Sequence, residues 1–202
     1  MKRIQSPAAN YQSSIIGSQY HVPHCIDLSI VRNVTTLTDN FIVTDINGKI
    51  FFNLKASLIS LYDHRLLLDA TGKTVVVTLR RKVMTGHDRW QAFRGESTDL
   101  KDLIFSVKRS PMFQTKIKLD VFLASNTKEQ ISDFKVKGSW LEKSCVVYAG
   151  ESHQIVAQMH KKEAFGKDNL TVRVYPNIDY AFIVAVILIL DEINQEKIRQ
   201  QQ

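Results

Sequence analysis

The chain has 202 residues, of which 27 are Lys or Arg and 20 are Asp or Glu, so its formal net charge at pH 7 is +7. The hydrophobic share of 44% and the charged share of 23% exclude wholesale disorder. Two cysteines are too few for a disulfide framework, and no run reaches the roughly 20 apolar residues that a membrane-spanning helix needs. The positive surplus points to an anionic partner, which could be phosphate-rich lipid, nucleic acid or an acidic protein.

Residues 1–24 are polar and contain Pro7 and Pro23, which predicts an N-terminal arm before a single domain over residues 25–202. No apolar run follows the two early basic residues, so the segment lacks the pattern of a secretory signal peptide. We therefore expect a cytoplasmic protein, with a peripheral membrane or nuclear location as further options. In that compartment both cysteines stay as thiols.

From Ile26 onwards the chain consists of short β-branched runs separated by turn residues. Asn47-Gly48 lies between two such runs, and this dipeptide is the strongest short signal for a β-hairpin. Thr71-Gly72 separates the next two runs in the same way. We expect about twelve strands, at residues 26–34, 41–46, 49–55, 65–70, 73–82, 89–95, 103–109, 116–124, 132–138, 144–149, 154–160 and 170–175. No Pro-, Gly- or Ser-rich linker divides them, which indicates one all-β domain.

The last element breaks the strand pattern. Residues 180–190 are apolar except for the hydroxyl of Tyr180, Asp179 is a suitable N-cap, and a charged tail follows. These features predict a helix over about residues 179–199. At about 1.5 Å per residue its apolar part spans roughly 17 Å, which is too short to cross a bilayer.

A helix that is apolar on every side has to be buried on every side. In a β protein, the interior of a closed barrel provides such a place. The sequence therefore predicts a mainly β fold, a closed antiparallel β-barrel of about twelve strands that encloses a hydrophobic C-terminal helix. The alternative is a hairpin that dips into a membrane.

Two groups of residues carry a resemblance to a known family. Trp90 is followed by Phe93-Arg94-Gly95, and the chain later contains Tyr175-Pro176-Asn177 and then Asp-Tyr-Ala-Phe at 179–182. From about Pro23 to Ile193 the sequence resembles the plant LURP-one-related family. That family looks like a small version of the tubby C-terminal domain and is similar to phospholipid scramblases. The resemblance implies a twelve-stranded barrel around a hydrophobic helix.

The resemblance also implies a setting for the function. The family is named for a member induced in plant defence, it has no established enzymatic activity, and its tubby relatives bind phosphoinositides through basic side chains. This chain lacks the cysteine-rich palmitoylation cluster associated with scramblases. It also shows no residue-by-residue match to the tubby lipid site, so that site is not carried over.

Four lysines are the candidate lipid-binding residues. Lys116 and Lys118 share one strand face, and Lys135 and Lys137 share a face of the run that follows. If the two strands are neighbours, four ammonium groups line one patch of wall that could hold a phosphorylated headgroup. The alternative is that outward lysines only solubilise the barrel and prevent edge pairing.

A second basic cluster, Arg80-Arg81-Lys82, lies at the end of a predicted strand. It is an alternative lipid patch, and it is short for a nuclear-import signal. Structural ion pairs are the other use of such residues. Nucleic-acid binding ranks last, because no groove-reading element is visible and the scattered aromatic residues do not form the stacking motif of an RNA-binding sheet.

Catalysis, metals and cofactors find no support in the sequence. His21, His24 and Cys25 offer three metal ligands, but no second ligand pair follows at a recognisable spacing. Cys145 could be paired with His153 or His160, yet nothing supplies an orienting third group. We expect no catalytic residue, no metal and no cofactor.

The function predicted from the sequence is that of a non-enzymatic intracellular binding module. Its expected ligand is anionic phospholipid or phosphoinositide at a membrane surface, in a plant defence or stress response. The alternative is a protein-interaction scaffold with an unknown protein partner and no lipid ligand. We expect a monomer.

Overall fold

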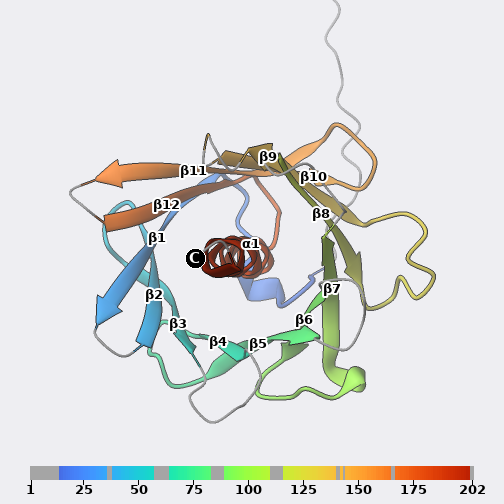
Figure 1. Cartoon of the computed structure of the whole chain (residues 1–202), viewed down its shortest axis with the longest axis horizontal. Coiled ribbons are helices and arrows are strands. Elements are labelled where there is room, and N and C mark those ends of the chain that lie inside the picture. Colours follow the sequence, from blue (N-terminus) through green and yellow to red (C-terminus); the bar gives the residue numbers. More distant parts are fainter. Residues whose placement is uncertain are drawn as a thin grey trace, which may run out of the picture.

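A computed structural model describes residues 14–35, 38–56, 64–82, 89–109, 116–139, 142, 144–164 and 167–200. Twelve strands within these ranges form a closed antiparallel barrel around one helix, α1 (Tyr180–Gln200), as Figure 1 shows. The strands are β1 (Ile26–Thr35), β2 (Thr38–Asp45), β3 (Ile50–Ala56), β4 (His64–Leu68), β5 (Val75–Lys82), β6 (Arg89–Arg94), β7 (Leu103–Arg109), β8 (Lys116–Leu123), β9 (Phe134–Ser139), β10 (Ser144–Ala149), β11 (Ile155–Ala164) and β12 (Lys167–Val174).

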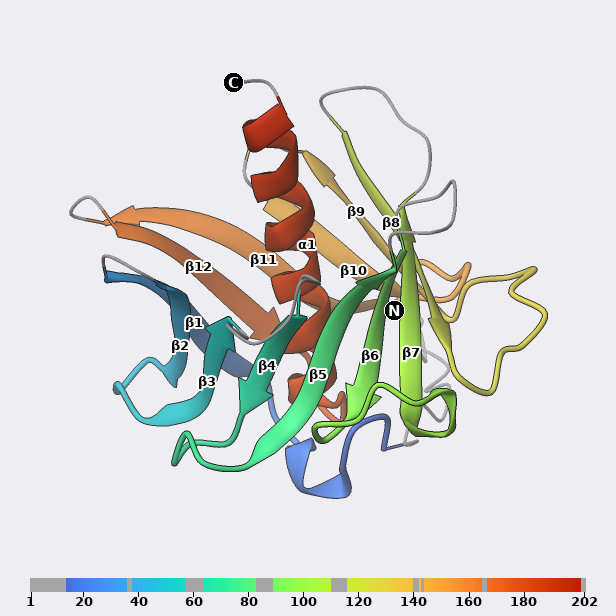
Figure 2. The same ribbon diagram turned by 60° about the horizontal axis from the view of Figure 1, so that its bottom comes forward.

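Each strand pairs with its neighbours in the sequence, and β1 pairs with β12 to close the barrel. The closure starts at Ile26, which lies opposite Val174. We call the end of the barrel where α1 begins the lower end and the end where α1 finishes the upper end, as they appear in Figure 2. Odd-numbered strands run from the lower to the upper end, and even-numbered strands run back.

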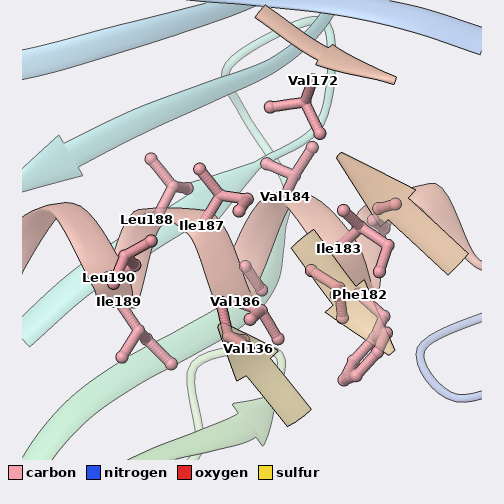
Figure 3. Close-up of a cluster of buried hydrophobic side chains, with 14 of the residues drawn as sticks. Val136, Val172, Phe182, Ile183, Val184, Val186, Ile187, Leu188, Ile189 and Leu190 are labelled. Atoms are coloured by element: carbon pink, nitrogen blue, oxygen red, sulfur yellow. The ribbon is translucent and has the colours of Figure 1, made fainter. Parts of the chain in front are cut away.

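The helix α1 runs along the barrel axis and fills the interior (Figures 1 and 2). Each residue from 181 to 190 is at most 1% exposed. Figure 3 shows this cluster of α1 side chains with Val136 and Val172 from the wall. The ring of Phe182 packs against Phe105 and Phe134, with centroids 5.1 and 4.8 Å away. The predicted barrel with its enclosed helix is therefore confirmed.

Most strand boundaries agree with the apolar runs, and the main difference lies in β11 and β12. The sequence predicts strands at residues 154–160 and 170–175, whereas backbone pairing continues to Ala164 opposite Lys167. These added residues are mostly polar or charged, so they carry no apolar alternation that could mark them as strand. Backbone pairing extends the strands there beyond the apolar alternation.

The described part of the predicted arm, residues 14–24, packs against the lower end of the barrel. Ile16 is 5% exposed, and the ring of Tyr20 lies 5.5 Å from that of Tyr180. The carboxylate of Asp179 caps α1 by accepting the backbone N–H of Phe182 at 3.0 Å. Its second oxygen accepts the N–H of Ile16 at 2.7 Å and that of Gly17 at 3.2 Å. One buried carboxylate thus fixes both the start of the helix and the N-terminal segment.

Candidate functional site

The four predicted lysines lie on the outer face of two paired strands, β8 and β9. Lys118 is directly opposite Lys137, Lys116 is opposite Ser139, and Lys135 is opposite Asp120. The alternate residues of both strands are apolar and point into the core, which leaves the lysines on the outside. The structure therefore brings the two pairs together on one wall of the barrel.

Lys135 differs from the other three because carboxylates surround it. Its ammonium lies 2.5 Å from Glu151 Oε1 and 4.0 Å from Asp120 Oδ1, and its side chain is only 18% exposed. Sequence reasoning could not foresee this, because Glu151 lies in the turn between β10 and β11. The charge of Lys135 is largely balanced within the protein.

Lys116, Lys118 and Lys137 are exposed, and we call these three residues the outer lysine face. Within the described ranges, no carboxylate forms an ion pair with any of them. Like charges directly opposite each other on paired strands repel. Lys137 has an aromatic contact, since its ammonium lies 5.4 Å from the ring centroid of Tyr148. An uncompensated pair of this kind favours an external anion.

Polar residues continue the row of Lys116 across three further strands. Ser139 lies opposite Lys116 on one side and Ser144 on the other, and Ser144 lies opposite His160 on β11. His160 is exposed. This row joins four strands, so only the pairing register reveals it. Hydroxyl and imidazole groups beside the outer lysine face add hydrogen-bonding capacity for an oxyanion.

The alternative basic cluster, Arg80-Arg81-Lys82, does not form one patch. Arg81 points into the barrel, where its guanidinium lies 3.2 Å from the carboxylate of Glu196 on α1. Arg80 lies on the other face, donates to Gln91 Oε1 at 3.1 Å and packs over the Phe93 ring. Strand geometry places neighbouring residues on opposite faces, so a three-residue run cannot act as one surface.

A further charged cluster, which the sequence did not reveal, is centred on Glu129 in the 124–133 loop. Arg89 on β6 donates to both Glu129 oxygens, at 2.8 and 2.7 Å. Lys108 on β7 also contacts the Glu129 carboxylate, and Ser106 Oγ lies 3.3 Å from Oε1. Burial alone would raise the pKa of Glu129, but the hydrogen bonds from Arg89 and Lys108 outweigh it and lower the pKa to about 2. The carboxylate is therefore held in its ionised form.

The residues considered for metal binding and nucleophilic chemistry serve the fold where their contacts are described. His21 Nδ1 lies 3.2 Å from the Asn177 carbonyl oxygen, and Cys25 is exposed. Cys145 is buried among apolar side chains, and burial raises the pKa of its thiol to about 12. Among the described residues, no three potential metal ligands gather into a cluster. In the same ranges, no helix combines the length and apolar character needed to cross a membrane.

These features define a class of protein, a helix-filled twelve-stranded β-barrel with a basic outer wall. The sequence model of the LURP-one-related family matches residues 26–191. The chain therefore belongs to the LURP-one-related family, as the sequence motifs predicted.

Several relatives from Arabidopsis thaliana are similar over nearly their whole length. Protein LURP-one-related 15 is 53% identical, over 95% of this chain and 90% of the relative. Protein LURP1 is 52% identical, over 90% of each chain. The crystal structure of an Arabidopsis thaliana protein with 50% sequence identity superimposes with a TM-score of 0.72, over 89% of this chain and 98% of the other. The barrel architecture is thus shared with a solved structure.

Proposed function

We propose that the protein is a non-enzymatic binding module that recognises anionic phospholipid through the outer lysine face. The observation that carries the proposal is the direct opposition of Lys118 and Lys137, both exposed and without a carboxylate partner among the described residues. Lys116 lies two residues from Lys118 on the same face of β8. A phosphorylated headgroup supplies the negative charge that this wall lacks.

The expected strength of this interaction is modest. Each lysine close to an anionic membrane contributes about 1 kcal/mol, so three contribute roughly 3 kcal/mol. That energy corresponds to about a hundredfold in affinity, and salt screens it strongly because the ammonium groups are exposed. A surface of this kind supports reversible binding in the cytoplasm rather than permanent anchoring. We place it in a plant defence or stress response, as the family resemblance implies.

The non-enzymatic part of the proposal rests on the candidate nucleophile. The Cys145 thiol has its pKa raised to about 12 by burial, and it faces the core of the barrel. A thiol in this state supplies almost no thiolate at neutral pH.

Co-sedimentation with phosphatidylcholine vesicles, with and without phosphoinositide, tests the lipid ligand. We expect the wild-type protein to prefer phosphoinositide vesicles and Lys118→Glu with Lys137→Glu to weaken that binding at least tenfold. Lys73→Glu with Lys101→Glu is the matched control, because it changes the net charge equally at exposed positions between strands at the lower end. Equal weak binding to both vesicles, or unchanged binding by the strand variant, would contradict the proposal.

The rival function is a protein-interaction scaffold whose basic wall has no lipid ligand. A protein partner whose binding is insensitive to salt and to Lys118→Glu with Lys137→Glu would favour it. Electrostatic lipid binding predicts the opposite salt dependence.

A further inference from the structure

The groups around Glu129 form the donor set of an oxyanion-binding site. Arg89 presents a guanidinium fork to both carboxylate oxygens, and Lys108 adds an ammonium group. Ser106 adds a hydroxyl from a residue that is only 3% exposed. A planar fork, a point charge and a hydroxyl around two oxygens are the groups that proteins use to bind phosphates and carboxylates.

These donors lie on the rigid wall of the barrel. Arg89 on β6 is directly opposite Lys108 on β7, and Ser106 is two residues away on the same face of β7. The ammonium of Lys108 also lies 5.1 Å from the ring centroid of Phe122 on β8. Two cations opposite each other on paired strands repel unless an anion lies between them. The wall therefore favours an anion at this position, whichever group supplies it.

The anion at this position is the carboxylate of Glu129, which belongs to a loop. The backbone of Glu129 is strained. Glu129 has a φ of +49°, in the left-handed region that residues with a side chain rarely adopt. Its N–H donates to Asn126 Oδ1 at 3.2 Å, which holds this conformation. Strained backbone of this kind is concentrated at functional sites and clamps. The strained backbone makes the seated position of Glu129 less favourable than that of a relaxed loop residue, which favours exchange of its carboxylate for another anion.

We propose that Arg89, Ser106 and Lys108 form a second anion-binding site, specific for a phosphate group, and that Glu129 occupies it as an internal competitor. A tethered carboxylate acts at an effective concentration on the order of millimolar. A phosphate group displaces it when it carries more charge or is itself concentrated at a surface. The site is separate from the outer lysine face, because Asp120 lies opposite Lys108 between the two.

Removal of the internal competitor tests the site. We expect Glu129→Gln and Glu129→Gly to bind inorganic pyrophosphate at least tenfold more tightly than the wild-type protein in calorimetric titration. Glycine adopts the left-handed turn without strain, so Glu129→Gly keeps the loop geometry if the Gln variant folds poorly. Asp99→Asn makes the same change in net charge at a side chain that is 70% exposed, and it should leave the affinity unchanged.

A second arm distinguishes free phosphate from a lipid headgroup. The same variants are mixed with phosphatidylcholine vesicles that contain phosphoinositide. Tighter binding of the Glu129 variants to pyrophosphate supports a site for soluble phosphate groups. Tighter binding to the vesicles alone supports a headgroup site. If the two Glu129 variants bind pyrophosphate and the phosphoinositide vesicles no more tightly than Asp99→Asn does, the proposal is overturned. Tighter binding that persists when Arg89→Gln is added to Glu129→Gln also overturns it. Lys118 and Lys137 stay intact in every variant, so a failure here leaves the proposed function of the outer lysine face standing.

Discussion

Arg65 and Glu192 form a bidentate ion pair inside the barrel, with Nε 2.5 Å from Oε1 and Nη2 3.1 Å from Oε2. Arg65 belongs to β4, and Glu192 is the second residue after the apolar run 180–190 of α1. The two side chains are only 12% and 7% exposed. The pair joins the wall to the helix at the level where the core changes from apolar to charged, one turn of α1 before the contact between Glu196 and Arg81.

Loss of one partner of this pair should be costly. Glu192→Leu removes the carboxylate that pairs with the buried Arg65 guanidinium, which is expected to lower the free energy of unfolding by about 3 kcal/mol. Arg65→Met combined with Glu192→Leu should recover a large part of the loss, since both charges of the pair are removed together. Urea unfolding followed by circular dichroism measures both. Asp27→Asn, in the exposed pair with Arg173, should cost less than about 1 kcal/mol. A cost for Glu192→Leu as small as that of Asp27→Asn would contradict this account.

Asp179 should control the stability of the lower end. Asp179→Ala removes the cap of α1 and the acceptor for the Ile16 and Gly17 amides, with an expected cost of about 2 kcal/mol. Hydrogen exchange of the two amides should accelerate more than exchange in the middle of α1. Asp179→Asn keeps one acceptor oxygen and should lie between the wild type and Asp179→Ala. Unchanged protection of Ile16 in Asp179→Ala would show that the carboxylate does not hold the segment.

The two cysteines should differ sharply in reactivity. Cys25 is exposed, whereas Cys145 is 2% exposed and burial raises the pKa of its thiol to about 12. A thiol-specific chromogenic reagent at pH 8 should therefore modify one group in the folded protein and two in concentrated urea. Cys25→Ser should remove the rapid reaction and leave only the one that needs unfolding. Rapid modification of folded Cys25→Ser would mean that the barrel interior opens readily.

Glu129 should make stability depend on acid pH. Its pKa is lowered from 4.5 to about 2, because the bonds from Arg89 and Lys108 outweigh the opposing effect of burial. A lowered pKa in the folded state means that the ionised carboxylate stabilises the protein fully above pH 4.5 and progressively less as the pH falls toward 2. The difference in unfolding free energy between the wild type and Glu129→Gln should be constant from pH 7 to about 5 and shrink at lower pH. A constant difference down to pH 3 would be inconsistent with this shift.

The fold could be predicted from the sequence because its strongest signals are local. Apolar alternation and turn residues marked the strands, and the apolar run over residues 180–190 required complete burial. The facing positions of the lysines followed from the period of two. The same period shows that Arg81 must face away from Arg80 and Lys82, so the mixed orientation of that cluster was available from the sequence.

The paired charges could not be predicted in this way. Arg65 and Glu192 lie 127 positions apart, and Glu129 lies 40 positions from Arg89. Only the strand register and the path of a loop bring such residues together. Nothing in the sequence around Glu129 distinguishes it from an ordinary loop residue. The ion pair between Lys135 and Glu151 could not be predicted from the sequence for the same reason.

The closure between β1 and β12 has a consequence for how the protein is made. The ribosome completes β1 early and β12 late, and it produces α1 only after all twelve strands. Until then the interior faces of the wall have no helix to pack against, so the growing chain presents apolar surface that nothing covers. Contacts between segments so distant along the chain form slowly and expose intermediates to aggregation. The segment that fills the barrel is thus synthesised after the whole wall, so completion of the core has to wait for α1.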